Sequence, residues 1–383
     1  MILVLNCGSQ SIKWKLFSEN LELIFQRKKE YFNLNSAKIS IKKELDYLEK
    51  LKSKIEIVGS RVVWGRFYEP KEINKEVLKE IEIGCEMAPL HNPFQLLAIK
   101  IAKERFKKAR HFAVFDTQFF KDLPLSSRIY PLPKEIIEKY QIFRLGFHGI
   151  SHKYLSIRAS EILKKPLKKL NLITLHLGGG ASITAIKKGK PIETSMGFSP
   201  LEGLVMTTRS GDLDPGILLF LLKKIKLDKI KKILNQESGL KAISGISNFK
   251  ELEKRKDQDS KLALEIFIKR IKKYLYGYYG ILKKVDAIVF GGTVGFGSLK
   301  VRNLVLKDFP FESIKSFAAK YDLRNIGTFF LKIFLYSAIS SGFALISCMM
   351  DLICCSNFSL STDVSPLIIV SNFFLSVYSI RIG

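Results

Sequence analysis

The stretch LVLNCGSQSIKWKLF, residues 3–17, predicts two β-strands joined by a tight turn. It begins as a buried strand, breaks at Gly8-Ser9-Gln10-Ser11, and then alternates apolar and polar side chains with a period of two. The alternation places three apolar side chains on one face of the second strand, namely Ile12, Trp14 and Leu16. A simple hairpin does not need the further polar groups that flank this turn, Asn6 and Lys13. The hairpin is therefore predicted to carry part of a functional site.

A second stretch, LITLHLGGGASITAI at residues 172–186, repeats this arrangement. Both have an apolar run, a polar residue, a Gly/Ser turn and an alternating strand, with Asn6 corresponding to His176. The repeat predicts a duplicated α/β domain with a cleft between the two copies. Two glycine-rich turns facing one cleft offer backbone N–H groups to the phosphates of a nucleotide.

The rest of the chain agrees with an α/β fold. The patterns predict helices at residues 41–53, 134–140 and 154–164, two helices around the turn at 87–93, and a strand at 111–115 that ends at Asp116. Residues 194–216 have little periodicity but contain Arg209 and two aspartates within six residues. Long irregular segments of this kind often line functional sites.

The composition permits a globular protein of two domains. The chain has 383 residues, 47% of them hydrophobic, and a net charge of +27. A nucleic-acid-binding protein is one interpretation of this charge, but lysines interleaved with isoleucine are typical of solvated helix faces, so we expect no specific nucleic acid as a partner. The five cysteines form neither a metal-binding spacing nor a disulfide framework, and residue 1 is not followed by a secretory leader. A cytoplasmic location is expected.

Six motifs in a fixed order resemble the acetate kinase family. They are NCGSQSIK at residues 6–13, APLHNP at 88–93, FDTQFF at 115–120, GFHGISH at 146–152, HLGGGAS at 176–182 and TSMGFSPLEGLVMTTRSGDLDP at 194–215. The resemblance extends from residue 1 to about 310, and the last motif separates this family from butyrate kinase. It implies two ribonuclease H-like domains of the actin-like ATPase type around an ATP cleft, at residues 1–146 and 147–311. It also implies a homodimer that transfers the γ-phosphoryl group of ATP to acetate with Mg²⁺ or Mn²⁺, giving acetyl phosphate and ADP.

The resemblance assigns roles to individual residues. Arg61 would hold the acetate carboxylate and Arg209 the transferring phosphoryl group, because a guanidinium fork binds two oxygens at once. The resemblance implies that the other catalytic side chains are Asp116 and His148, and that Asn6 orients the metal ion. It implies an acetate methyl pocket formed by Val63, Leu90, Phe147 and Pro200, which would also admit propionate. The implied ATP-binding residues are Lys13, His176, Leu177, Gly178, Gly179, Gly180, Asn248, Phe249, Lys250, Thr293, Val294, Gly295, Phe296 and Gly297.

Several positions depart from the family pattern. Ser60 and Phe120 stand where histidine is usual, and Trp64-Gly65-Arg66 replaces His-Gly-Gly. We interpret Arg66 as an ordinary ion-pair partner. In the nucleotide region, Asn248-Phe249-Lys250 replaces Asp-x-Arg, and residues 293–297 lack the usual Glu-Asn pair. These changes leave the reacting groups in place, and we expect them to alter the affinity for the nucleotide and the preference for its base.

The segment 312–383 differs in kind from the rest. Residues 325–383 contain four charged residues and eleven serines, and residues 333–350 are an uncharged run of transmembrane length. A membrane anchor, a hydrophobic tail and translation in a shifted reading frame are the three interpretations. The family's C-terminal glutamate, which helps to hold magnesium, is missing, since Glu312 is the last glutamate. Impaired activity is therefore expected, and the alternative is a non-enzymatic or membrane-tethered remnant.

Overall fold

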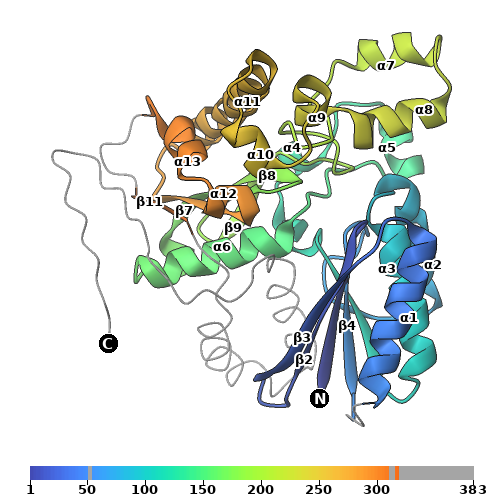
Figure 1. The fold of residues 1–383 in the computed structure, drawn as a ribbon. Helices are drawn as coiled ribbons and strands as arrows, with labels where there is room; N and C mark the ends of the chain where they lie inside the picture. The colour runs from blue at the N-terminus through green and yellow to red at the C-terminus, as the bar shows by residue number, and fades with distance from the viewer. Residues whose placement is uncertain (51–53, 310–314, 319–383) are drawn as a thin grey trace.

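The computed structural model describes residues 1–50, 54–309 and 315–318 (Figure 1). Its first sheet has the strand order β3-β2-β1-β4-β6-β5. The strands are β1 Ile2–Cys7, β2 Ser11–Phe17, β3 Leu23–Glu30, β4 Ile57–Val62, β5 Lys71–Glu72 and β6 Arg110–Phe115. β1 to β3 form an antiparallel meander, and β4 and β6 run parallel to β1. The opening stretch is thus a hairpin, as its alternation predicts.

The second sheet repeats this topology. Its order is β9-β8-β7-β10-β11, with β7 Asn171–Leu177, β8 Ala181–Lys187, β9 Lys190–Thr194, β10 Ala287–Gly291 and β11 Lys315–Ala318. β7 to β9 are antiparallel, and β10 and β11 run parallel to β7. The five strands match β1, β2, β3, β4 and β6 one for one, which confirms the predicted duplication.

The helices of the first half cover its sheet. They are α1 Leu34–Lys50, α2 Lys75–Met87, α3 Asn92–Arg105, η1 Gln118–Asp122, α4 Leu125–Arg128 and α5 Lys134–Tyr140. α1 to α3 gather on one side of the strands (Figure 1). There Trp14 of β2 is buried and its Nε1 donates to Glu44 Oε2 of α1 at 2.8 Å. α1 begins seven residues before the predicted helix, where Ser36 and Asn33 cap each other's backbone N–H groups.

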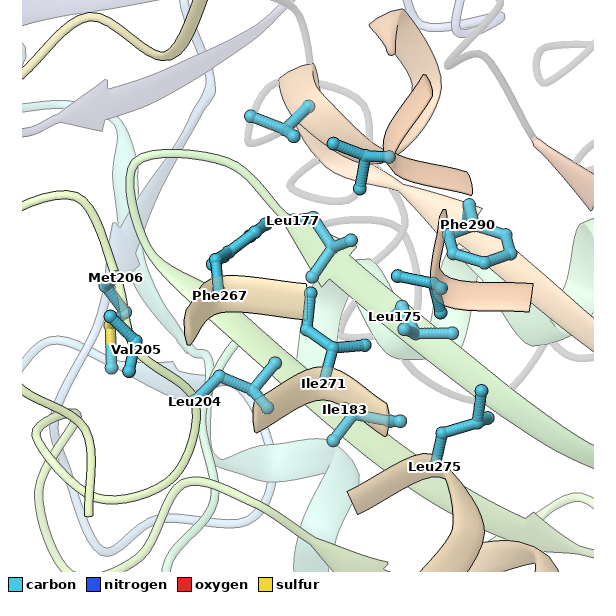
Figure 2. Close-up of a cluster of buried hydrophobic side chains, with 14 of the residues drawn as sticks. Leu175, Leu177, Ile183, Leu204, Val205, Met206, Phe267, Ile271, Leu275 and Phe290 are labelled. Carbon is cyan, nitrogen blue, oxygen red and sulfur yellow. The ribbon is translucent and has the colours of Figure 1, made fainter. Parts of the chain in front are cut away.

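Some of the helices of the second half, among them α6 and α11, cover the two faces of the other sheet. The helices of this half are α6 Gly149–Ile162, η2 Leu167–Lys169, α7 Pro215–Leu222, α8 Leu227–Lys232, η3 Ile233–Glu237, α9 Gly239–Ser244, α10 Phe249–Lys254, α11 Gln258–Leu282, α12 Gly292–Gly297 and α13 Leu299–Leu306. Phe267, Ile271 and Leu275 of α11 pack on Leu175, Ile183 and Phe290 of the strands (Figure 2). The α/β class with duplicated actin-like domains is confirmed.

Helix α6 is buried between the two sheets. Its residues Ile150, Tyr154 and Leu155 share one core cluster with Val4 and Phe112 of the first sheet. The same cluster contains side chains of the second sheet, Leu172, Ile186 and Val289. The position of the α6 N-terminus is therefore fixed by packing on both sides.

The fold continues past the predicted limit of the second domain at residue 311. β11, Lys315–Ala318, pairs in parallel with β10 and completes the second sheet. Residues 315–318, which lie in the segment expected to be a hydrophobic tail, thus belong to the fold. The uncharged run at residues 333–350 lies outside the described residues. Within the described part of the chain, no helix has both the length and the apolar character needed to cross a membrane.

Candidate functional site

The side chains that the sequence predicts to form one site lie at the ends of strands and helices in both halves of the chain. Parallel β1, β4 and β6 bring Asn6, Arg61 and Asp116 to the same edge of the first sheet. Arg61 Nε and Nη2 donate to the two Asp116 carboxylate oxygens at 3.0 and 2.6 Å, and Arg61 Nη1 donates to Asn6 Oδ1 at 3.3 Å. Asp116 is 1% exposed. A bidentate pair with so little freedom fixes the direction of the guanidinium.

Arg209 is a buried cation in the irregular segment at residues 194–216. Its Nη1 donates to the Pro200 carbonyl at 3.2 Å, and no carboxylate of the described residues forms an ion pair with it. Burial lowers the pKa of Arg209 to about 10, so it remains charged at neutral pH. The neighbouring Leu204, Val205 and Met206 anchor the segment in the core of the second half (Figure 2). A buried, uncompensated guanidinium attracts an anion strongly.

His148 immediately precedes α6 and has a left-handed backbone, with φ +56°. Non-glycine residues adopt this conformation at a cost, and it is common at functional sites. A Cβ placed on Gly180 would lie 3.1 Å from His148 Nε2 and 3.8 Å from Arg209 Nη1. The second glycine turn therefore meets both side chains. Burial and the nearby His176, Arg61, His152 and Arg209 hold the pKa of His148 well below its ordinary value, so the imidazole is neutral.

Two other histidines border these groups. His91 Nε2 lies 3.2 Å from Arg209 Nη2, and its Nδ1 is 4.0 Å from a Cβ placed on Gly8 of the first turn. Burial and the Arg209 cation lower the pKa of His91 well below its ordinary range. The His176 ring stacks on His148 with centroids 4.2 Å apart, and burial with the Arg61 charge lowers the pKa of His176 to about 3. Sequence reasoning gave His91 no role, and only its position within APLHNP marked it.

The residues expected to hold the acetate methyl group are partly brought together. Val63 and Phe147 are buried in one core cluster, and the Pro200 carbonyl accepts from Arg209. Leu90 is partly buried, directly before His91. Trp64, one of the departures from the family pattern, is buried beside Val63, and its Nε1 donates to the Phe198 carbonyl at 3.0 Å. This bond links the two halves next to the expected pocket.

Two further departures have clear structural roles. Arg66 donates to both Glu80 carboxylate oxygens at 2.8 Å, an ion pair as predicted. Phe120 is buried under Gly146, where a Cβ would lie 2.4 Å from its ring, and its ring centroid is 6.2 Å from that of His152. The aromatic ring thus supports the turn that leads into His148.

The residues expected at the nucleotide fall into two groups. Gly178 is close to Thr293, because a Cβ placed on Gly178 would lie 3.3 Å from Thr293 Oγ1. Thr293, Val294, Gly295, Phe296 and Gly297 form α12, and Arg302 Nη1 donates to the Gly295 carbonyl at 2.9 Å and the Phe296 carbonyl at 2.5 Å.

The second group surrounds the start of α10. Asn248 caps this helix by accepting from the Lys250 N–H, and Phe249 packs on Phe267 of α11 with ring centroids 5.4 Å apart. Lys13 lies opposite Asn6 in the first hairpin. The role of these residues at the nucleotide stays a prediction.

The oxygen groups beside Arg61 fit a magnesium ion that is held mainly by water and phosphate. The described residues contain no cluster of three or more His, Cys, Asp and Glu side chains suited to a metal. Asn6 Oδ1 and the Asp116 oxygens nevertheless surround one guanidinium, and each carboxylate oxygen can accept a second interaction. Magnesium at phosphoryl-transfer sites commonly uses one or two carboxylates and completes its shell with water and substrate phosphates.

Comparison with known proteins places this geometry in one family. Residues 25–328 match the model of the acetokinase family. An acetate kinase of Thermoanaerobacter pseudethanolicus is 40% identical over 362 residues, covering 85% of this chain and 90% of the relative. Acetate kinase of Porphyromonas gingivalis superposes with a TM-score of 0.70 at 36% identity, covering 81% of this chain and 87% of that one. A propionate kinase of Francisella tularensis gives 0.72 at 35% identity, covering 80% and 86%. The family match extends to residue 328, past residue 310, where the resemblance was expected to end.

Proposed function

Because the chain belongs to the acetokinase family, whose members are phosphotransferases that use ATP and a divalent metal, we propose that it transfers the γ-phosphoryl group of ATP to acetate. The products are acetyl phosphate and ADP, and the transfer is reversible. One observation carries the proposal for this chain. Arg61 of the first half, which is held by Asp116 and Asn6, lies near His148 and Arg209 of the second half. The charges of both arginines lower the pKa of His148, and Arg209 also contacts His91 of the first half.

The proposed roles follow from charge and geometry. Phosphoryl transfer needs the donor and acceptor held in line and negative charge neutralised on the transferring group. Arg209 supplies a fixed buried cation for the phosphoryl oxygens, and neutral His148 supplies an N–H donor beside it. Arg61 is directed by Asp116 and receives the acetate carboxylate. Each group is positioned before the substrates bind, which reduces the reorganisation needed in the transition state.

The nucleotide is proposed to lie along the turn of Gly178, Gly179 and Gly180, with its base toward α10 and α12. Lys13 and His176 border its phosphates. Magnesium is the proposed metal, held near Asn6 and Asp116, and it would neutralise charge on the β- and γ-phosphates. Only the sequence motifs support the proposed position of the base.

Acetate is the proposed acceptor, and propionate is proposed as a second one. A single methylene changes binding in an apolar pocket by only ~1–3 kcal/mol. The structural relative named as a propionate kinase is as similar to this chain as the one named as an acetate kinase. Val63 and Phe147 are the side chains proposed to set the ratio of the two rates.

A homodimer is also proposed, with domains divided near residue 146. Helix α7 exposes four large apolar side chains, Ile217, Leu219, Phe220 and Leu222, at 43–65%. It projects from the periphery of the molecule (Figure 1). Clustered exposed apolar side chains are a common feature of subunit interfaces.

The test is a coupled assay of ADP formation from ATP, magnesium and acetate, with the full chain. Arg209→Lys keeps a positive charge and loses the fork, so we expect kcat to fall by ~10²–10³-fold, as for the loss of a preorganised donor. Arg66→Lys is the matched control, because Arg66 pairs with Glu80 away from the site, and it should retain wild-type rates.

Failure of the unaltered chain to form ADP with acetate or propionate would contradict the proposed function. That outcome is the one expected if loss of the C-terminal glutamate inactivates the enzyme. A rate typical of the family would instead exclude an inactive remnant.

A further inference from the structure

A line of buried polar side chains runs from His148 into the interior between α6 and the second sheet. His148 Nδ1 lies 2.9 Å from Ser182 Oγ of β8, and Ser182 Oγ lies 2.8 Å from His152 Nε2 of α6. His152 Nδ1 lies 2.8 Å from Thr174 Oγ1 of β7. Ser182, His152 and Thr174 have no exposed surface. The line connects the proposed donor to a hydroxyl deep in the fold.

Both imidazoles in the line are neutral. Burial holds the pKa of His148 and of His152 well below the ordinary value, and neighbouring His176 lowers both further. A neutral imidazole carries one N–H, so each ring donates from one nitrogen and accepts at the other. A serine hydroxyl between two rings donates to one and accepts from the other. The whole line therefore has only two possible directions of donation.

The buried end decides between these directions. Among the described residues, the hydrogen-bond partner of the Thr174 hydroxyl is His152 Nδ1. If His152 Nδ1 carried the proton, it would donate to Thr174 Oγ1, and the Thr174 hydrogen would have no acceptor among the described residues. A buried polar hydrogen without a partner is strongly unfavourable. If Thr174 donates to His152 Nδ1, every hydrogen in the line is used.

We propose that hydrogen-bond donation runs from Thr174 through His152 and Ser182 to His148. Thr174, His152 and Ser182 are then positioning residues, which hold His148 in the tautomer with the proton on Nε2. The inference rests on the proposed function for its catalytic meaning. His148 Nε2 is the ring nitrogen beside Gly180, on the side of Arg209. The line thus presents an N–H to the phosphoryl oxygens. The reverse direction would present a lone pair that repels them.

The experiment compares Thr174→Val, which removes the first donor at nearly constant volume, with Thr174→Ser, which keeps it. The side-chain ¹⁵N signals of the five histidines report directly which ring nitrogen of His148 is protonated. His148→Gln identifies the signal of His148. We expect Nε2 protonation in the unaltered chain and in Thr174→Ser, and a mixture of tautomers in Thr174→Val.

The kinetics provide the second measurement. We expect Thr174→Val to lower kcat by ~10–100-fold, by analogy with the loss of an outer hydrogen-bond partner of a metal-ligating histidine. KM for ATP and for acetate should change little, and Thr174→Ser should keep most of kcat. Protonation of His148 on Nδ1 in the unaltered chain would overturn the proposal. So would wild-type kcat and an unchanged tautomer in folded Thr174→Val. If the chain has no kinase activity, the proposed function fails while the spectrum still decides the tautomer.

Discussion

Replacing Gly180 with alanine should lower kcat without unfolding the protein. Gly180 has no positive φ, so its backbone accepts alanine. The new Cβ would lie 3.1 Å from both Cε1 and Nε2 of His148, a few tenths of an ångström closer than ordinary contact. His148 cannot easily give way, because it stacks on His176 and its Nδ1 is held by Ser182.

The expected size follows from this displacement. A misplacement of 1 Å at reacting groups costs on the order of 10²-fold in rate. A shift of a few tenths of an ångström therefore predicts a loss of ~4–10-fold in kcat, or about 1 kcal/mol in the activation free energy. The direction of the shift, away from Gly180, moves the His148 N–H away from the place that Arg209 borders.

The assay is steady-state kinetics with varied ATP and acetate, together with a thermal melt. Gly277→Ala is the control: Gly277 lies within α11, has nothing within 4 Å of its new Cβ, and should keep kcat with a slightly raised melting temperature. An unchanged kcat in folded Gly180→Ala would refute the placement of His148. A rise in KM for ATP alone would mean that the Cβ meets the nucleotide instead.

Three further predictions concern the acetate fork, acid stability and assembly. Arg61→Lys should raise KM for acetate by ~10-fold or more in the kinetic assay, because an ammonium group cannot replace a bidentate fork. An unchanged KM would contradict this. Below pH ~6.5 the unfolded chain binds more protons than the folded chain, because each buried histidine stays neutral when folded. The free energy of unfolding should therefore decrease as the pH is lowered, by up to ~1.4 kcal/mol per pH unit for each such histidine. Urea unfolding between about pH 7 and 5 measures how the free energy of unfolding depends on pH, and His152→Gln should weaken this dependence. Equal free energies of unfolding at the two pH values would refute the prediction. Phe220→Glu should convert a dimer to a monomer in light scattering, whereas an exposed control such as Leu262→Glu on α11 should not; a dimer that survives would exclude α7 as the interface.

The duplicated fold was predictable from sequence because its signal is local. Each strand–turn–strand unit shows its own alternation, and the two units resemble each other closely enough to imply one ancestral domain. The position of Asp116 beside Arg61 was predictable because both residues lie at the same ends of neighbouring parallel strands. The contact of His91 with Arg209 was not, since it joins residues from different halves whose approach depends on the packing of α6 between the sheets.

The buried polar side chains between His148 and Thr174 correspond to a pattern in the sequence that can be interpreted only once the packing of α6 is known. Alternate residues of β7 and β8 face α6, and register pairs Leu172 with Ile186, Thr174 with Thr184, and His176 with Ser182. The face is apolar at the end far from the glycine turn and polar near it. Period-two alternation cannot explain this gradient, because both faces of the sheet are buried. Buried polar side chains require partners. α6 supplies them from the turn that carries the proposed donor, with Ser151 for His176 and His148 and His152 for Ser182. A polar patch at one end of a doubly buried strand pair therefore indicates which end faces the reaction.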